Sequence, residues 1–110
     1  MPLTKEGNLS GCVSSSNCFL VEWEFGNVNQ AYDKLIKIAS QQPRTQVLEE
    51  TNNYWHGVCR SLLFRFPDDL EILKKPRPGI IQVRSASRFG VSDLGVNERR
   101  VRALYKKLIG

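Results

Sequence analysis

The sequence predicts an α+β domain in which a curved antiparallel sheet of about five strands carries two helices on one face. Its 110 residues suit one domain with one core. Strand-like stretches joined by short turn-forming segments favour antiparallel pairing. Two further stretches carry apolar residues at helical spacing and can cover one face of such a sheet.

The chain begins with a polar arm, which we assign to residues 1–18, and continues as a single α+β domain over residues 19–110. In the stretch FLVEWEF, residues 19–25, aromatic and aliphatic residues alternate with glutamates. This period of two predicts the first strand.

A helix is expected after this strand. Asn27, with Gln30 three residues later, is typical of a helix N-cap with its capping box. Apolar residues then recur at helical spacing. The helix is expected to stop by Gln42, because Pro43 disfavours helical geometry in the residue before it.

Four strands follow in the prediction. Residues 44–50 form one, and the aromatic-rich residues 54–66 form a long one that Pro67 interrupts. Residues 69–73 form a shorter strand, and residues 80–87 form the last strand after a proline-rich loop.

The chain is predicted to end in a helix capped by Asn97, with Glu98 in its first turn. Val101, Leu104, Tyr105 and Leu108 form its apolar stripe. The resulting order, β-α-β-β-β-β-α, resembles the TATA-binding-protein-like or helix-grip arrangement, a likeness that implies no shared function.

Charge is concentrated near the C-terminus. Residues 1–83 contain nine basic and nine acidic side chains, whereas residues 84–110 contain seven and two. Such a surface attracts acidic proteins or anionic groups, although a solvated helix face is the plainer interpretation. The absence of a nucleic-acid-binding motif argues against a nucleic-acid partner.

Neither a membrane span nor an export signal is evident, since no apolar run approaches the ~20 residues that a membrane helix needs. We therefore expect a cytoplasmic protein with reduced thiols. Cys12 and Cys18 can still form a bridge in an oxidising compartment. A Cys-His dyad is not expected, because His56 and Cys59 would point to opposite faces of one strand. No metal or cofactor is expected either, because a metal site would have to recruit Cys12 and Cys18, whose spacing is not that of a zinc finger.

Arg84 and Arg88 lie on one face of the last strand and could hold a phosphate or carboxylate. Alternatively they form ion pairs with the neighbouring acidic strand, through Asp68, Asp69 or Glu71. Pairing of Leu73 with Ile80 would place Asp69 opposite Arg84. We assign Arg84 to such a structural pair and regard Arg88 as the better ligand candidate.

Ser85 and Ser87 alternate with these arginines and either donate to an anion or are small residues beneath a helix. The connector FGVSDLGVN contains Asp93, suited to an Asx-turn, and ends at the cap Asn97. Its backbone N–H groups could bind an anion at the helix N-terminus. Its glycines fit neither a dinucleotide-binding motif nor a P-loop.

Five aromatic residues could line a ligand pocket in a curved sheet, but core packing is the default in a domain of this size. They are Trp23, Tyr54, Trp55, Phe64 and Phe66.

The stretches CVSSSNC, FRFPDDLEIL and RSASRFGVSDLGVNERRV resemble the family known as domain of unknown function 1499. The resemblance is to its cyanobacterial and plastid type, which implies a link with photosynthesis. The arm departs from the family pattern, which commonly has proline beside the cysteines. The matching positions are Asp68, Asp69, Arg84, Ser85, Ser87, Arg88, Gly90, Asp93, Gly95, Asn97 and Arg100.

The favoured function is a non-enzymatic binding or assembly module that presents Arg88, Arg99, Arg100 and Arg102 to an acidic protein partner or a small anionic ligand. The alternative is a carrier of a small apolar ligand whose anionic head meets Arg84 or Arg88. An enzyme is less favoured, because the adjacent carboxylates of Asp68 and Asp69 point to opposite faces of a strand.

Overall fold

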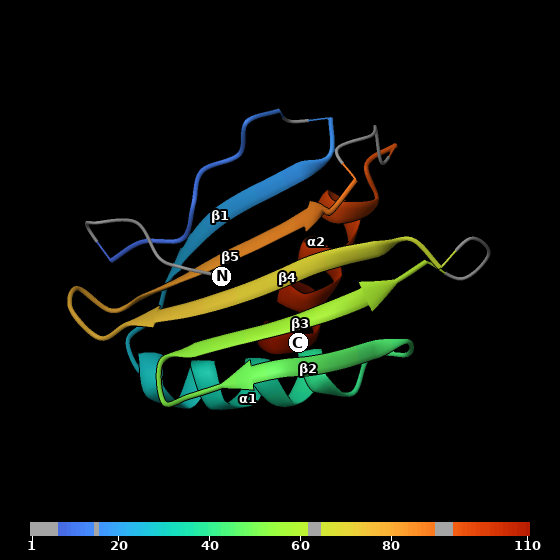
Figure 1. Cartoon of the computed structure of the whole chain (residues 1–110). Helices are drawn as coiled ribbons and strands as arrows, with labels where there is room; N and C mark the ends of the chain where they lie inside the picture. Colours follow the sequence, from blue (N-terminus) through green and yellow to red (C-terminus); the bar gives the residue numbers. More distant parts are fainter. Residues whose placement is uncertain (1–6, 15, 62–64, 90–93) are drawn as a thin grey trace.

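The computed structural model describes residues 7–14, 16–61, 65–89 and 94–110. It confirms the predicted element order and the antiparallel α+β class (Figure 1). The sheet has five strands in the order β1-β5-β4-β3-β2, and every neighbouring pair is antiparallel. The elements are β1 (Cys18–Glu24), α1 (Val28–Ser40), β2 (Thr45–Glu50), β3 (Tyr54–Arg60), β4 (Pro67–Lys75), β5 (Ile80–Ser87) and α2 (Val96–Ile109).

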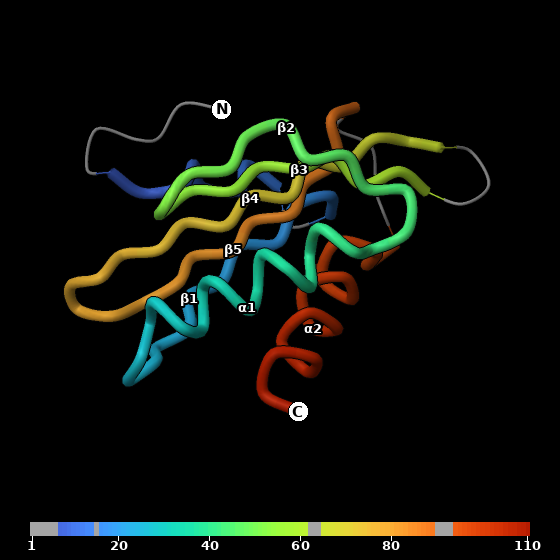
Figure 2. Tube along the Cα trace, turned by 90° about the horizontal axis from the view of Figure 1, so that it is seen from below, coloured from blue at the N-terminus to red at the C-terminus, as the bar shows by residue number. Residues whose placement is uncertain are grey.

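Both helices lie on the same face of the sheet (Figure 2). The core fills the layer between them, with Trp55 from β3 and Leu35 from α1 at its centre, each fully buried. Trp23 packs at its margin. Phe66 is not core: it is exposed and forms an edge-to-face contact with Phe89. Phe64, another of the aromatic candidates, lies outside the described residues.

The first helix begins and ends as its sequence predicts. The Asn27 side chain accepts a hydrogen bond of 3.1 Å from the backbone N–H of Gln30, which satisfies one of the free donors of the first turn. The helix ends at Ser40, before Pro43.

Two strand boundaries differ from the prediction. β3 ends at Arg60 rather than at residue 66, and residues 62–64 lie outside the described chain. Pro67 does not interrupt a strand but begins β4, where its missing N–H costs little. β4 then continues through Lys74 to Lys75, into the segment predicted to be a loop.

This longer β4 corrects the predicted register. Lys75, not Leu73, lies opposite Ile80. The pairing therefore shifts by two residues and places Glu71, not Asp69, opposite Arg84.

The second helix begins earlier than predicted. Gly95, with a left-handed φ of 82°, precedes its first residue, Val96, a conformation that glycine adopts without steric cost. Asn97 is not the cap: its side chain is fully buried and contacts Ser85 of β5.

The N-terminal arm packs on the sheet face opposite the helices. Leu9 is buried against Tyr54 and Leu73, and its backbone N–H donates to Gln82. A disulfide between Cys12 and Cys18, the bridge that the sequence left open, ties the arm to the start of β1. Cys59 is free and buried.

Candidate functional site

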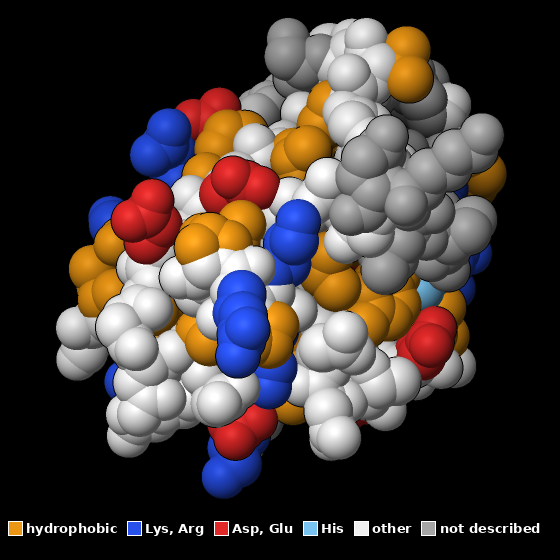
Figure 3. All heavy atoms as spheres, turned by 90° about the vertical axis from the view of Figure 1, so that its left-hand side faces the viewer, with side chains coloured by type: hydrophobic (Ala, Val, Ile, Leu, Met, Phe, Trp, Pro, Cys, Tyr) orange, Lys and Arg blue, Asp and Glu red, His pale blue; other side chains and the backbone are white. Residues whose placement is uncertain are grey.

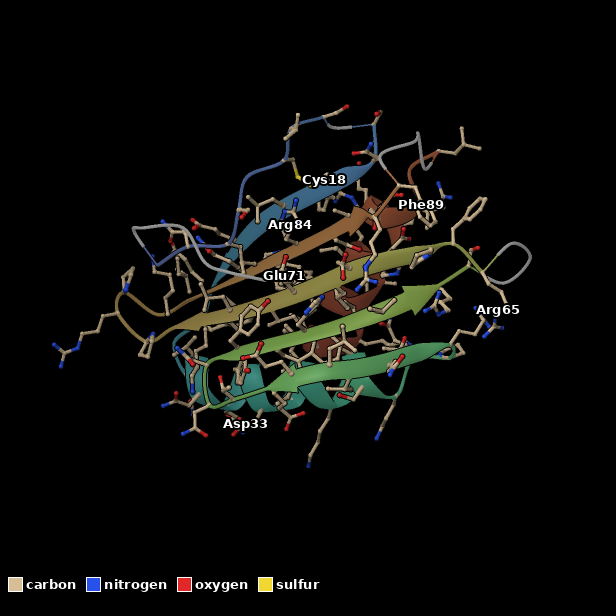
Figure 4. The ribbon with its side chains drawn as sticks, viewed as in Figure 1. Cys18, Asp33, Arg65, Glu71, Arg84 and Phe89 are labelled. Atoms are coloured by element: carbon tan, nitrogen blue, oxygen red, sulfur yellow. A yellow bond between two sulfur atoms is a disulfide. The ribbon has the colours of Figure 1, made fainter. Side chains whose placement is uncertain are left out.

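Glu71 and Arg84 form an ion pair near the middle of the face that the helices leave open (Figure 4). Arg84 Nη1 lies 3.3 Å from Glu71 Oε1, and the Tyr54 hydroxyl donates to Glu71 Oε2 at 2.6 Å. Burial raises the pKa of Tyr54, and the bond to Glu71 raises it further. Arg84 is thus neutralised within the fold by Glu71, one of the three acids considered from the sequence, and not by Asp69, which the predicted register placed opposite it.

Arg88 is more exposed than Arg84, but it too belongs to an ion pair. Its Nε and Nη2 donate to the two carboxylate oxygens of Asp69 at 2.9 and 3.1 Å. His56 Nε2 lies 2.7 Å from Asp69 Oδ1. Burial alone would raise the pKa of Asp69, but the bonds from His56 and Arg88 lower it to about 2.

Arg100 joins α2 to the sheet through a second buried cluster. Its Nη1 lies 3.0 Å from Asp68 Oδ2 and donates to Ser85 Oγ and Asn97 Oδ1. The Ser85 hydroxyl donates to Asn97 at 2.6 Å. The structure therefore brings four predicted residues into one cluster, in which Arg100 contacts each of the other three: Asp68, Ser85 and Asn97.

The other predicted residues are more dispersed. Ser87 is half-buried, and its backbone N–H donates to Asn17. Arg102 is exposed and pairs with Glu98 at 2.8 Å. Arg99 Nη1 donates to the backbone carbonyl of Leu94. Asp93, together with Gly90, lies outside the described residues.

A pocket of ≈ 330 Å³ lies where α2 begins, next to the start of β2 and the end of β3. Four arginines line it, and among the described residues no Asp or Glu does. We call it the arginine pocket; its lining residues are Gln42, Pro43, Arg44, Thr45, Cys59, Arg60, Val96, Arg99 and Arg100.

The β2–β3 pairing positions two of these arginines. Thr45 lies opposite Cys59, so Arg44 and Arg60 meet just beyond this pair. Arg44 has a left-handed φ of 58°, and its Nε donates to the carbonyl of Arg60 at 3.2 Å. The Arg60 N–H donates back to the Arg44 carbonyl at 3.0 Å. These contacts fix both backbones at the mouth of the pocket.

The pocket is electropositive. Asp68 compensates Arg100, but no ion pair of Arg44, Arg60 or Arg99 occurs within the described part of the chain. The N-terminus of α2, at Val96, adds the positive end of the helix dipole. By contrast, Figure 3 shows basic and acidic side chains intermingled at the side of the molecule that it faces.

Sequence reasoning missed Arg44 and Arg60, because they lie far along the chain from the basic segment. The available signal was the β2–β3 hairpin: aligning its strands places both arginines at one end of the sheet.

The Cys59 thiol and the possible metal ligands can be described residue by residue. Burial raises the pKa of the Cys59 thiol, although its bond with Thr45 opposes the effect. Within the described residues, no group of three or more His, Cys, Asp or Glu could hold a metal ion. No described helix has the length and apolar character to cross a membrane.

Comparison with known proteins identifies the family of the chain. No curated protein matches the chain. A family model described as "Protein of unknown function (DUF1499)" matches residues 8–108, which include the arm from residue 8 onward, every strand and almost all of α2. The chain therefore belongs to the DUF1499 family.

Proposed function

We propose that this protein is a non-enzymatic binding module whose arginine pocket takes an anionic group, a carboxylate or phosphate, presented by an acidic protein partner. The observation that carries the proposal is that four arginine residues line one pocket of ≈ 330 Å³, which no described Asp or Glu lines. Guanidinium groups present planar, paired donors that match carboxylate and phosphate oxygens.

The proposal shifts the binding surface from the one that the sequence suggested. Arg99 and Arg100 remain part of it. Arg88 does not line the pocket and pairs with Asp69, and Arg102 lies elsewhere on α2. Arg44 and Arg60 replace them. Because Arg100 is already paired with Asp68, Arg44, Arg60 and Arg99 are the residues that would hold the anion.

The cellular setting is also a proposal. The signature stretch supports the cyanobacterial or plastid type and a link with photosynthesis, by resemblance alone. The Cys12–Cys18 disulfide argues against a cytoplasmic location, because disulfides are typical of oxidising compartments. Trapping free thiols in cells of the native host would decide this point: a bridged pair there contradicts a reducing compartment.

The carrier alternative loses support in its original form. It requires a cavity between sheet and helices, with the head group of the ligand near Arg84 or Arg88. The described core occupies the middle of that layer, and both arginines belong to ion pairs on the opposite face.

A titration tests the proposal. Binding of an aspartate-rich peptide and of inorganic phosphate would be measured by calorimetry for the unmodified protein, Arg60→Glu and Arg77→Glu. Arg77 is exposed in the β4–β5 turn, so its replacement makes the same change in net charge away from the pocket. Arg60→Glu should weaken binding at least ~10-fold, and Arg77→Glu by less than ~2-fold.

Binding should also weaken steeply between ~0.05 M and ~0.5 M salt, because the interaction is between charges at a surface. Equal losses in the two variants would assign the effect to net charge and would refute the pocket. Binding that neither variant changes would do the same.

A further inference from the structure

A second concave site lies at the opposite edge of the sheet from β2. Because β1 is an edge strand, the alternate residues that face the helices remain half-buried beside α2. They and one side of α2 enclose a groove of ≈ 370 Å³, within the usual size range of ligand sites. We call it the edge groove; it is lined by Phe19, Val21, Trp23, Val101, Arg102, Tyr105 and Lys106.

The walls of the groove are apolar and partly aromatic. The rings of Trp23 and Tyr105 lie 4.7 Å apart between centroids and tilt by 48°. Val101, which is 1% exposed, belongs to the core beneath. Covering apolar surface that is open to water with an apolar ligand lowers the free energy, so these walls favour binding of an apolar group.

The charged residues of the groove are both basic. Arg102 and Lys106 are one helical turn apart on α2, so they lie on the same side of the helix. Arg102 pairs with Glu98 and lies over the Phe19 ring, 5.7 Å from its centroid. Within the described part of the chain, Lys106 has neither an ion pair nor a side-chain hydrogen bond, and no acid lines the groove.

From this combination we infer that the edge groove binds a small amphiphile with one apolar tail and one anionic head. The tail lies against Phe19, Val21 and the Trp23–Tyr105 pair, and the head meets the ammonium group of Lys106. The site is separate from the arginine pocket, with which it shares no lining residue. It therefore does not depend on the proposed function.

Fluorescence titration provides the test, with decanoate, decanol and decylamine as probes below their micelle-forming concentrations. Trp23 lines the groove, whereas the other tryptophan, Trp55, is fully buried in the core. Decanoate should change the emission at the lowest concentration, decanol should bind at least ~5-fold more weakly, and decylamine more weakly still.

Neighbouring lysines supply the matched variants, because Lys106 lines the groove and Lys107 does not. Lys106→Glu should abolish or reverse the preference for decanoate over decylamine, while Lys107→Glu should leave it intact. Val21→Trp should fill the groove and reduce decanoate binding at least ~10-fold, with folding checked by circular dichroism.

Each of three outcomes would overturn the inference. The first is equal binding of the three probes, which shows only nonspecific apolar contact. The second is an equal effect of the two lysine replacements. The third is undiminished binding to a folded Val21→Trp variant.

Discussion

The ion pair between Asp68 and Arg100 attaches the N-terminal half of α2 to β4, and replacing Asp68 with asparagine should weaken that attachment strongly. The two side chains are 8% and 12% exposed. Removing one partner of a buried pair costs roughly 3–5 kcal/mol, because the remaining charge stays buried. Arg100 keeps its bonds to Ser85 and Asn97, so we expect a loss near ~3 kcal/mol, the low end of that range.

The same helix supplies the control. Glu98 and Arg102 form a pair whose side chains are 48% and 65% exposed, and such pairs contribute about 0–1 kcal/mol. Urea unfolding followed by circular dichroism would compare Asp68→Asn with Glu98→Gln. A double variant, Asp68→Asn with Arg100→Met, should recover part of the loss, since no charge is left buried. Similar losses for Asp68→Asn and Glu98→Gln would refute this reasoning.

Three further predictions concern other parts of the fold. The carboxyl of Asp69 has a pKa of about 2, below its usual 3.8. This lowered pKa corresponds to roughly 2 kcal/mol of folding stability, which should be present above pH ~4 and lost as the pH falls to ~2. Asp69→Asn should remove that part of the pH dependence in acid unfolding curves, and an unchanged curve would contradict the assignment. Gly57→Ala should lower the free energy of unfolding in urea by about 1–3 kcal/mol, because the added Cβ would lie 2.5 Å from Cη2 of the buried Trp55. An unchanged free energy of unfolding would show that the Trp55 ring can move. Cys12→Ser should cost roughly 2 kcal/mol by freeing the short loop that ends at Cys18, measured by thermal unfolding with and without reductant. Reductant should then destabilise the unmodified protein but not the variant, and equal sensitivity of the two would contradict the bridge.

The elements that the sequence predicts well are those governed by local chemistry. Residues 80–87, which lie between Gly79 and the connector, are predicted as the last strand and match β5 in full. The side chain of Asn27 meets its partner three residues away, so its capping role needs no knowledge of the rest of the fold. The arrangement of five strands and two helices follows from such local signals.

Tertiary contacts decide the features that the sequence did not reveal. Asparagine is a common helix N-cap, so Asn97 is a reasonable cap candidate from the sequence. In the fold its side chain instead forms buried hydrogen bonds with Ser85 and Arg100, and the helix begins one residue earlier, at Val96. The partner of Arg84 depends on strand register, and a slip of two residues keeps the same face while changing the acid opposite it.

The arginine pocket illustrates the same limit for function. Its members come from the start of β2, the end of β3 and the first turns of α2. Of the four arginines that line the pocket, charge counting along the chain identified only Arg99 and Arg100. Arg44 and Arg60 become part of the site through antiparallel pairing, which no run of neighbouring residues encodes.

The central claim is that an anionic group binds among Arg44, Arg60 and Arg99. Amide chemical shifts recorded by NMR during titration with inorganic phosphate test it most directly. The account predicts that the largest changes fall on residues 43–45, 59–60 and 96–100, which surround the arginine pocket. Changes confined to residues 84–88, or spread evenly over all basic residues, would contradict it.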